Sequence, residues 1–392
     1  MTLPQGAVAL TSTERVIFGR PAAAAIAEEA ERLGASRVVL IASKSLAEQT
    51  DEIDRIKSAL GPRCAAVHTG IAPHVPRPDV VAAAETARRA KADLIVSVGG
   101  GSVTDCAKIV PVLLKHGVTD AKGMEPYHMY VTDAGQLVKP AFEAPDVRVI
   151  CVPTTLSGGE FNPLSGATDA ETRHKQGYEH RMMAPISVIL DPALGRHTPE
   201  WLWFSTGIRS LDHAIETLAS FQSNPYCDGL AESALRLLVA GLPRAKADPE
   251  DMEARLNCQI GVWQSMLPIL AGVPMGASHA IGHVLGGLCE VPHGYTSCVM
   301  TPFVLAWNAE VGAARQKRIA ACFGDPSRSA SEQADAFIRG LGLPRSLREV
   351  NVGPDRFQAI ADYAMKDIWG RTNPRPISRP DDVMEILRAA AG

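Results

Sequence analysis

The sequence lacks the features that mark secreted, membrane-spanning or nucleic-acid-binding proteins. Its longest apolar runs, such as Val38 to Ala42 and Leu94 to Val98, fall far short of the ~18–20 residues that span a bilayer. No basic segment precedes the first apolar residues, so we expect no signal peptide. Lys and Arg number 39 against 43 Asp and Glu, a net charge of −4. This balance argues against binding nucleic acid or anionic membranes through bulk charge.

The eight cysteines form no CxxC pair, and a chain of 392 residues needs no disulfides to hold its core. We therefore expect reduced thiols and a cytoplasmic protein. Hydrophobic residues make up 46% of the chain and charged residues 21%, which predicts a folded core and no extended disorder. The length corresponds to about two domains.

The first half of the chain alternates between short β-rich runs and helical stretches. Near-continuous apolar strands separated by helices predict a parallel sheet covered on both faces. The expected strands are 37–42, 64–69, 93–98, 147–152 and 186–191, and the expected helices are 45–60, 78–92 and a helix after Ser102. Residues 117–146 are expected to form a long surface excursion between two strands.

Beyond Asp191 only helical periodicity is found. The expected helices are 206–221, 229–245, 251–271, 274–288, 329–341, 354–368 and 380–391. The fold class predicted is thus an α/β N-terminal Rossmann-like domain followed by an all-α C-terminal domain. We place the boundary within 192–197 and assign residues 1–194 to dinucleotide binding and 195–392 to the substrate or metal site.

A glycine loop stands where one strand ends and a helix begins, in VSVGGGSVTDCAK at 96–108. Such a loop lets backbone N–H groups approach a phosphate, and the helix N-terminus adds about half a positive charge. A tight turn that only needs glycine is the alternative. A second loop, VPTTLSGGEFNP at 152–163, places hydroxyls at another strand end. Two such loops together favour one dinucleotide site at the carboxyl edge of the sheet.

Four histidines concentrate in two helical segments. His279 and His283 are four residues apart and share a helix face, His293 lies at a Pro-His-Gly turn, and His213 belongs to another helix. The HxxxH spacing also occurs in zinc proteases, but these need a Glu where this chain has Ala280. Imidazoles are common ligands of catalytic metals. Hydrogen-bonded core histidines are the alternative.

These motifs together resemble the iron-containing alcohol dehydrogenase family. The likeness rests on the GGGS loop, the PTT strand end, Asp191-Pro192, the HAIE helix at 213–216 and the HxxxH(x9)H spacing, and it runs from about residue 10 to 390. It implies a Rossmann-type domain joined to a helical domain, with NAD(H) or NADP(H) and a divalent ion, iron or zinc.

The resemblance also implies a role for particular positions. Those implied to bind the pyrophosphate are Gly99, Gly100, Gly101 and Ser102; those near the rest of the nucleotide are Thr154, Thr155, Ser157 and Lys175. The positions that match three of the family's four metal ligands are His213, His279 and His293. His283 matches the histidine beside the nicotinamide and the substrate.

Arg209 stands where metal-binding members of the family have an Asp ligand, four residues before His213. A guanidinium cannot bind a cation, and at ~4 Å each unit of like charge costs about 4 kcal/mol at an effective dielectric of ~20. Either Arg209 turns away, as a solvent-facing helix residue would, or the metal is weak or absent. Asp212 lies about 60° off the Arg209–His213 face and could pair with Arg209.

The resemblance extends to the maleylacetate reductase branch of the family, which looks metal-independent and also lacks that Asp. HVLGG at 283–287 and NPRPI at 373–377 are similar to segments of this branch, although its usual replacement for the Asp is Asn.

The choice of coenzyme depends on the end of the first strand. Ser43 and Lys44 follow that strand, where metal-type members often place an Asp that repels a 2′-phosphate. NADPH should therefore be tolerated beside NADH.

We expect an NAD(P)H-dependent reductase of a small, carboxylate-bearing carbonyl compound, with His283, His213 and Arg209 as catalytic residues. A metal-dependent alcohol dehydrogenase is the nearest alternative. A lyase resembling dehydroquinate synthase would need more Lys and Arg near the histidines. A non-catalytic nucleotide-binding protein is the third. The expected assembly is a homodimer.

Overall fold

The computed structural model describes residues 7–132 and 136–392. Contacts divide the chain into two compact units, an α/β unit at 11–198 and a helical unit at 199–392 together with the first described residues, 7–10. The predicted boundary between 194 and 195 lies four residues before this division. The functions assigned to the two domains stay predictions.

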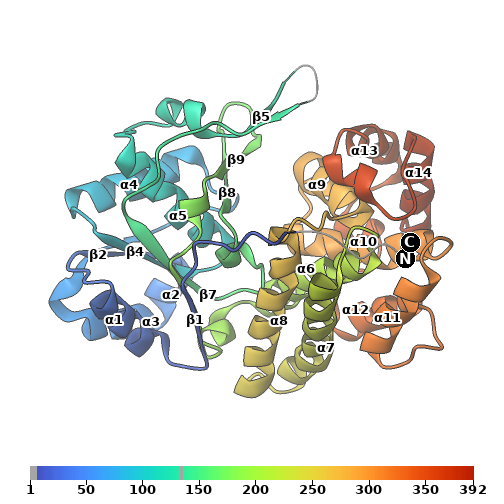
Figure 1. Ribbon diagram of the computed structural model, residues 1–392, viewed down its shortest axis with the longest axis horizontal. Coiled ribbons are helices and arrows are strands. Elements are labelled where there is room, and N and C mark those ends of the chain that lie inside the picture. The colour runs from blue at the N-terminus through green and yellow to red at the C-terminus, as the bar shows by residue number, and fades with distance from the viewer. Residues whose placement is uncertain (1–6, 133–135) are drawn as a thin grey trace. The chain divides into compact units, whose positions relative to one another are not determined.

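The α/β unit is built on a six-stranded sheet with the order β1-β10-β7-β4-β2-β3, in which every neighbouring pair is parallel (Figure 1). Its strands are β1 (Arg15–Phe18), β2 (Val38–Ala42), β3 (Cys64–Thr69), β4 (Leu94–Gly99), β7 (Arg148–Pro153) and β10 (Ser187–Leu190). The strand order reverses direction between β2 and β4. In open α/β sheets, ligands bind at the carboxyl ends of the strands beside such a reversal.

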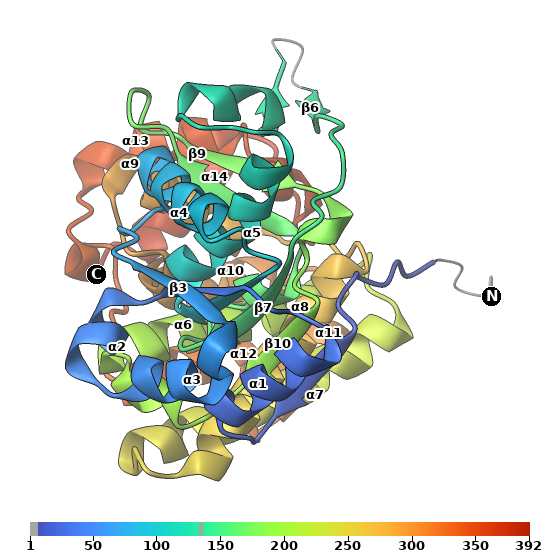
Figure 2. The ribbon, with the colours of Figure 1, turned by 90° about the vertical axis from the view of Figure 1, so that its left-hand side faces the viewer.

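Both faces of the sheet are buried. Val39 and Ile41 of β2 pack into one core, and Val38 and Leu40 pack into the other, because successive side chains of a strand point to opposite faces. Helices α4 (Arg77–Arg89) and α5 (Gly101–Lys115) cover the first face, and α1 (Ala22–Arg32) and α3 (Glu52–Leu60) cover the second (Figure 2). The predicted parallel sheet with two covered faces is confirmed.

Some elements of this unit differ from the prediction. The single helix expected at 45–60 is two helices, α2 (Lys44–Gln49) and α3, because Thr50 between them is extended and bonds its hydroxyl to the Leu46 carbonyl at 2.6 Å. Edge strand β1 and the antiparallel pair β8 (Leu164–Thr168) and β9 (Lys175–Glu179) were not predicted. The excursion at 117–146 contains two further short strands, β5 (Tyr130–Val131) and β6 (Leu137–Val138).

The described residues of the other unit form helices and no strands, as predicted. The helices are α6 (Glu200–Ala219), α7 (Pro225–Ala247), α8 (Met252–Leu270), α9 (Ala277–Cys289), α10 (His293–Asn308), α11 (Ala313–Phe323), α12 (Ala330–Gly340), α13 (Phe357–Ala364) and α14 (Pro380–Ala389). Helices α10 and α11 were not predicted. The Pro-His-Gly turn assigned to His293 was wrong, because Pro292 is the N-cap and His293 the first residue of α10.

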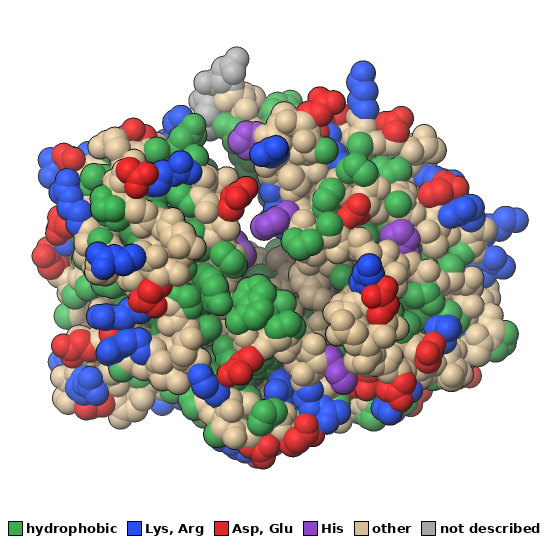
Figure 3. Space-filling view, turned by 180° about the vertical axis from the view of Figure 1, so that it is seen from behind, with side chains coloured by type: hydrophobic (Ala, Val, Ile, Leu, Met, Phe, Trp, Pro, Cys, Tyr) green, Lys and Arg blue, Asp and Glu red, His purple; other side chains and the backbone are tan. Residues whose placement is uncertain are grey.

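Two surface properties bear on function. Within the described part of the chain, no helix has the length and apolar character to cross a bilayer. Figure 3 shows Lys and Arg interspersed with Asp and Glu over the face it presents. That mixture agrees with the small net charge of the whole sequence and shows no extended basic region on this face.

A buried lysine holds the loop that follows β7. The ammonium of Lys108, on α5, donates to the Gly159 carbonyl at 2.7 Å and the Leu164 carbonyl at 2.6 Å, and contacts both oxygens of Asn162. Burial lowers the pKa of Lys108. These carbonyls accept hydrogen bonds from the ammonium in a buried environment. The lysine therefore fixes loop 159–164 beside the carboxyl edge of the sheet.

We therefore expect Lys108→Met to lower the free energy of unfolding by about 3 kcal/mol, because several buried carbonyls lose their donor. Urea denaturation monitored by circular dichroism measures this. Lys115→Met is the control on the same helix: Lys115 pairs with an Asp146 carboxylate that is largely exposed, so its loss should cost below about 1 kcal/mol. Equal losses in the two variants would contradict a structural role specific to Lys108.

Candidate active site

The glycine loop joins β4 to α5 and leaves little room for side chains at Gly99 and Gly100. A Cβ atom on Gly99 would lie 2.8 Å from Cγ2 of Val103, and one on Gly100 would lie 3.0 Å from Cγ2 of Thr155. Gly100 is the N-cap of α5, and no side chain caps this helix. The N–H groups of its first turn are therefore suited to an anion such as a dinucleotide pyrophosphate.

The other predicted nucleotide contacts gather at neighbouring strand ends. The backbone N–H of Thr154 donates to the Gly99 carbonyl at 3.0 Å, and that of Ser43 donates to the Val98 carbonyl at 2.9 Å. These bonds place the ends of β2, β4 and β7 side by side, at the reversal of strand order. Thr155 donates its hydroxyl to the Ser157 hydroxyl at 3.2 Å. The arrangement fits a dinucleotide across this edge.

Lys175 is held against the same helix from the β8–β9 pair. Its ammonium lies 3.0 Å from a carboxylate oxygen of Asp105 on α5. Lys44, which follows Ser43, lies 3.8 Å from Glu48 within α2. Each lysine thus has an acidic neighbour within the protein. Their contacts with a nucleotide stay predictions.

In the helical unit, one face of α6 carries four ionisable side chains. Arg209, Asp212, His213 and Glu216 occur at the spacing i, i+3, i+4, i+7 that aligns residues on a helix, and all four are buried. Arg209 is 5% exposed and its Nη1 donates to the Ser297 hydroxyl at 3.3 Å, so it is not a solvent-facing residue. Burial lowers the pKa of Arg209 to about 10, which leaves it charged at neutral pH.

The sequence suggested a direct pair between Asp212 and Arg209, but the Asp212 carboxylate bonds two serine hydroxyls instead. One carboxylate oxygen, Oδ2, accepts hydrogen bonds from the hydroxyls of Ser278 at 2.7 Å and Ser297 at 2.8 Å. Ser297 therefore connects the carboxylate to the guanidinium. Burial, and then the neighbouring Glu216 carboxylate, raise the pKa of Asp212.

Glu216 joins α6 to the start of α9. Its carboxylate accepts from the backbone N–H groups of Gly276 and Ser278 and from Nδ1 of His279, each at 2.8 Å. Burial raises the pKa of Glu216, while the two backbone N–H groups oppose this shift. A single side chain thus caps the helix that carries the HxxxH pair and orients its first histidine.

The four histidines lie in a row. His213 and His279 stack with ring centroids 4.9 Å apart, and His283 and His293 stack at 6.3 Å. His279 and His283 meet edge to face at 6.5 Å and join the two pairs. Burial lowers the pKa of His213 and of His279 well below the ordinary value, so both rings are neutral at pH 7.

The fit of these residues to a divalent ion is mixed. His279 donates Nδ1–H to the Glu216 carboxylate, as metal-bound histidines commonly do. Its Nε2 and Nδ1 of His213 are buried without a hydrogen-bond partner. Asp212, Glu216 and His279 also lie close enough to share an ion. However, Glu216 already receives three hydrogen bonds, and the buried charge of Arg209 opposes a cation. The set as a whole does not fit a divalent ion.

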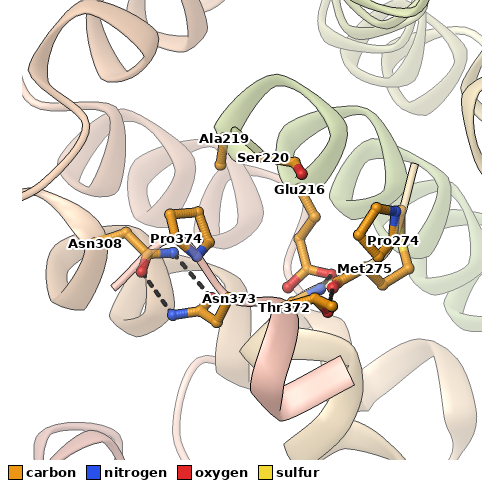
Figure 4. A pocket seen from close by; sticks show the side chains of 10 residues that line it. Glu216, Ala219, Ser220, Pro274, Met275, Asn308, Thr372, Asn373 and Pro374 are labelled. Atoms are coloured by element: carbon orange, nitrogen blue, oxygen red, sulfur yellow. Dashed lines mark hydrogen bonds between the residues drawn. The ribbon is translucent and has the colours of Figure 1, made fainter. Parts of the chain in front are cut away.

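Several residues of this site were not identified from the sequence. Glu216 is the last residue of the HAIE motif, and its place on the Arg209 face of α6 was a usable signal for a role in the site. Asp367 bonds His283, and the ring of Trp369 lies 5.0 Å from that of His283, yet both come from a distant segment with no recognisable motif. Beside Glu216 lies a small pocket whose wall includes the paired amides of Asn308 and Asn373 (Figure 4).

Close packing at Gly276 offers a test of the Glu216 contacts. A Cβ atom there would lie 2.9 Å from Oδ1 of Asn373 and 3.1 Å from Oε1 of Glu216. We expect Gly276→Ala to cost about 1–3 kcal/mol in thermal or urea unfolding. Gly287→Ala on the same helix meets nothing within 4 Å and should be neutral or slightly stabilising. If both variants match the parent in stability, the carboxylate is not tightly held.

Comparison with known proteins matches both halves of the chain to one family. The model of the iron-containing alcohol dehydrogenases matches residues 13–192, and that of the C-terminal part of the Fe-containing alcohol dehydrogenase family matches 203–391. Dehydrogenase ALT3 of Alternaria alternata is 34% identical, with 91% of this chain and 99% of the relative covered. Maleylacetate reductase 2 of Cupriavidus pinatubonensis is 32% identical, with 96% and 94% covered. The crystal structure of maleylacetate reductase from Agrobacterium tumefaciens superposes with a TM-score of 0.83 at 27% identity, with 99% of each chain covered.

Proposed function

The chain belongs to the iron-containing alcohol dehydrogenase family, and from this premise we propose that it reduces the carbonyl group of a small oxo-acid with NADH or NADPH, without a catalytic metal. Curated relatives named as maleylacetate reductases support this substrate class. These relatives are dehydrogenases and reductases, so the lyase and the non-catalytic alternatives are not proposed.

The observation that carries the proposal is the buried guanidinium of Arg209 beside neutral imidazoles. As a carbonyl is reduced, its oxygen gains negative charge, and one preorganised donor to such an oxygen lowers the barrier by roughly 3–4 kcal/mol. Arg209 supplies a fixed positive charge where burial keeps water from screening it. Its planar fork also matches a carboxylate, which favours an acidic substrate over a simple aldehyde.

The coenzyme, when bound, supplies a hydride to the carbonyl carbon. The chain's own residues do the rest. The N–H groups at Gly101 and Ser102 hold the pyrophosphate, and Ser43 leaves the ribose side without the carboxylate that would repel a 2′-phosphate. His283 gives a proton to the substrate oxygen, because its side chain is 38% exposed and accessible to a small molecule. His213 is the second candidate donor. We expect a homodimer.

The first test combines metal content with turnover. Protein purified without a chelator is analysed for iron and zinc, and oxidation of NADH and NADPH is followed with maleylacetate before and after EDTA. We expect substoichiometric metal and EDTA-resistant turnover with both coenzymes. Arg209→Gln should lower kcat/KM by about 100–1,000-fold, because it removes the charge opposite the oxyanion. Stoichiometric metal with activity lost on chelation would contradict the proposal.

A metal-dependent alcohol dehydrogenase is the second candidate, favoured by the two buried imidazole nitrogens that have no partner. The variant Arg209→Asp separates the two readings, because it provides the carboxylate found in metal-binding members. We expect it to gain zinc or iron binding, measured by calorimetry with the metal alone, and to lose oxo-acid reduction. Arg209→Lys, which keeps the charge but not the fork, serves as the control and should bind no metal. If the parent binds metal as tightly as Arg209→Asp, then Arg209 does not exclude the ion.

A further inference from the structure

His283 is oriented by a residue that lies 84 positions further along the chain. Its Nδ1 lies 2.9 Å from Oδ2 of Asp367. Asp367 directly precedes a short 3-10 helix, η8 (Ile368–Thr372). Two further contacts hold this segment against the start of α9: Thr372 donates its hydroxyl to the Met275 carbonyl at 2.6 Å, and Asn373 accepts from the Ala277 N–H at 3.2 Å.

Both oxygens of the Asp367 carboxylate are used. Oδ1 accepts the backbone N–H of Trp369 at 2.9 Å, which makes Asp367 the N-cap of η8. Oδ2 faces His283. An ionised carboxylate can only accept, so Nδ1 of His283 must carry the hydrogen of this bond. In the neutral ring, Nε2 is then the nitrogen with the free lone pair.

The ring of His283 is also fixed by its neighbours. The Trp369 ring lies 5.0 Å away at 39°, and the His293 ring is nearly parallel at 6.3 Å. At the same time the His283 side chain keeps 38% of its surface exposed, against 1% for His279. His283 thus combines a fixed orientation with access to a small molecule.

We propose that Asp367 is the positioning residue of the reductase: it holds His283 in the Nδ1–H form and directs Nε2 at the substrate oxygen. This inference rests on the proposed function. In the step it serves, the N–H bond at Nε2 of the imidazolium breaks and an O–H bond forms on the reduced substrate. The ring is left neutral with its remaining hydrogen on Nδ1, bonded to the Asp367 carboxylate, and a proton from the solvent then returns to Nε2.

The informative variant is Asp367→Asn. Its amide oxygen can still accept the Trp369 N–H, so the start of η8 is retained. Its amide nitrogen, however, can only donate toward His283, which turns Nδ1 into an acceptor and moves the ring hydrogen to Nε2. We expect kcat to fall by about 100-fold or more, with the KM for the coenzyme within about twofold of the parent and unchanged thermal unfolding.

The direct readout is the tautomer of His283. ¹⁵N NMR of histidine-labelled protein distinguishes Nδ1–H from Nε2–H rings, and the His283→Gln variant assigns the signal. We expect Nδ1–H in the parent and Nε2–H in Asp367→Asn. Asp362→Asn is the matched control: Asp362 is an exposed residue of α13 that accepts from Gln358, and its replacement should change neither the tautomer nor kcat.

Asp367→Ser provides a second variant, since a serine hydroxyl can cap η8 but is too short to hold His283. It should lose kcat as Asp367→Asn does, with the signal of His283 broadened between tautomers. An unchanged tautomer in Asp367→Asn, or full kcat in both variants, overturns the inference. If the parent reduces no oxo-acid, the proposed function fails, and the tautomer measurement still decides whether Asp367 orients His283.

Discussion

The carboxylate of Glu216 is the constraint on which the candidate site depends. It is buried, and it accepts hydrogen bonds from two backbone N–H groups at the start of α9 and from Nδ1–H of His279. Unpaired, each of these groups would cost about 1–3 kcal/mol in the interior, so the contacts hold α6 and α9 in one register. That register also sets Arg209 beside Gly282, between the two histidines of the HxxxH pair.

Much of the fold followed from the sequence because its signals are local. Strands such as Cys64–Thr69 are apolar runs between turns, and long amphipathic helices such as Met252–Leu270 show their period over several turns. Elements whose stability comes from partners were missed. Strands β8 and β9 contain Gly166 and Gly177, which have low strand propensity, and they pair with each other across a turn. Helix α10 begins at a Pro-His-Gly sequence that is equally typical of a turn.

From residue patterns alone, the histidine and arginine site was predictable only where its residues sit on one element, and the grouping of His213 with His279 and His293 came from the family resemblance. The four ionisable residues on one face of α6 and the HxxxH spacing are visible in the sequence, as is the unusual Arg209. Asp367, Trp369 and Asn373 are brought to α9 by tertiary packing, and no periodicity relates residue 367 to residue 283. Burial could not be foreseen either: it is burial that neutralises His213 and His279 and lowers the pKa of Arg209. Roles in catalysis remain predictions for all of these residues.

The presence of Arg209 also sets the charge of the interior before any ligand arrives. Its guanidinium offsets part of the charge of the two buried carboxyl groups, Asp212 and Glu216, whose pKa values burial raises. With an Asp at this position, the same face of α6 would bury three carboxyl groups and no guanidinium, and the cost of burying their charges would not be offset by Arg209. One residue thus decides whether this buried face of α6 carries a cation of its own or acidic groups alone.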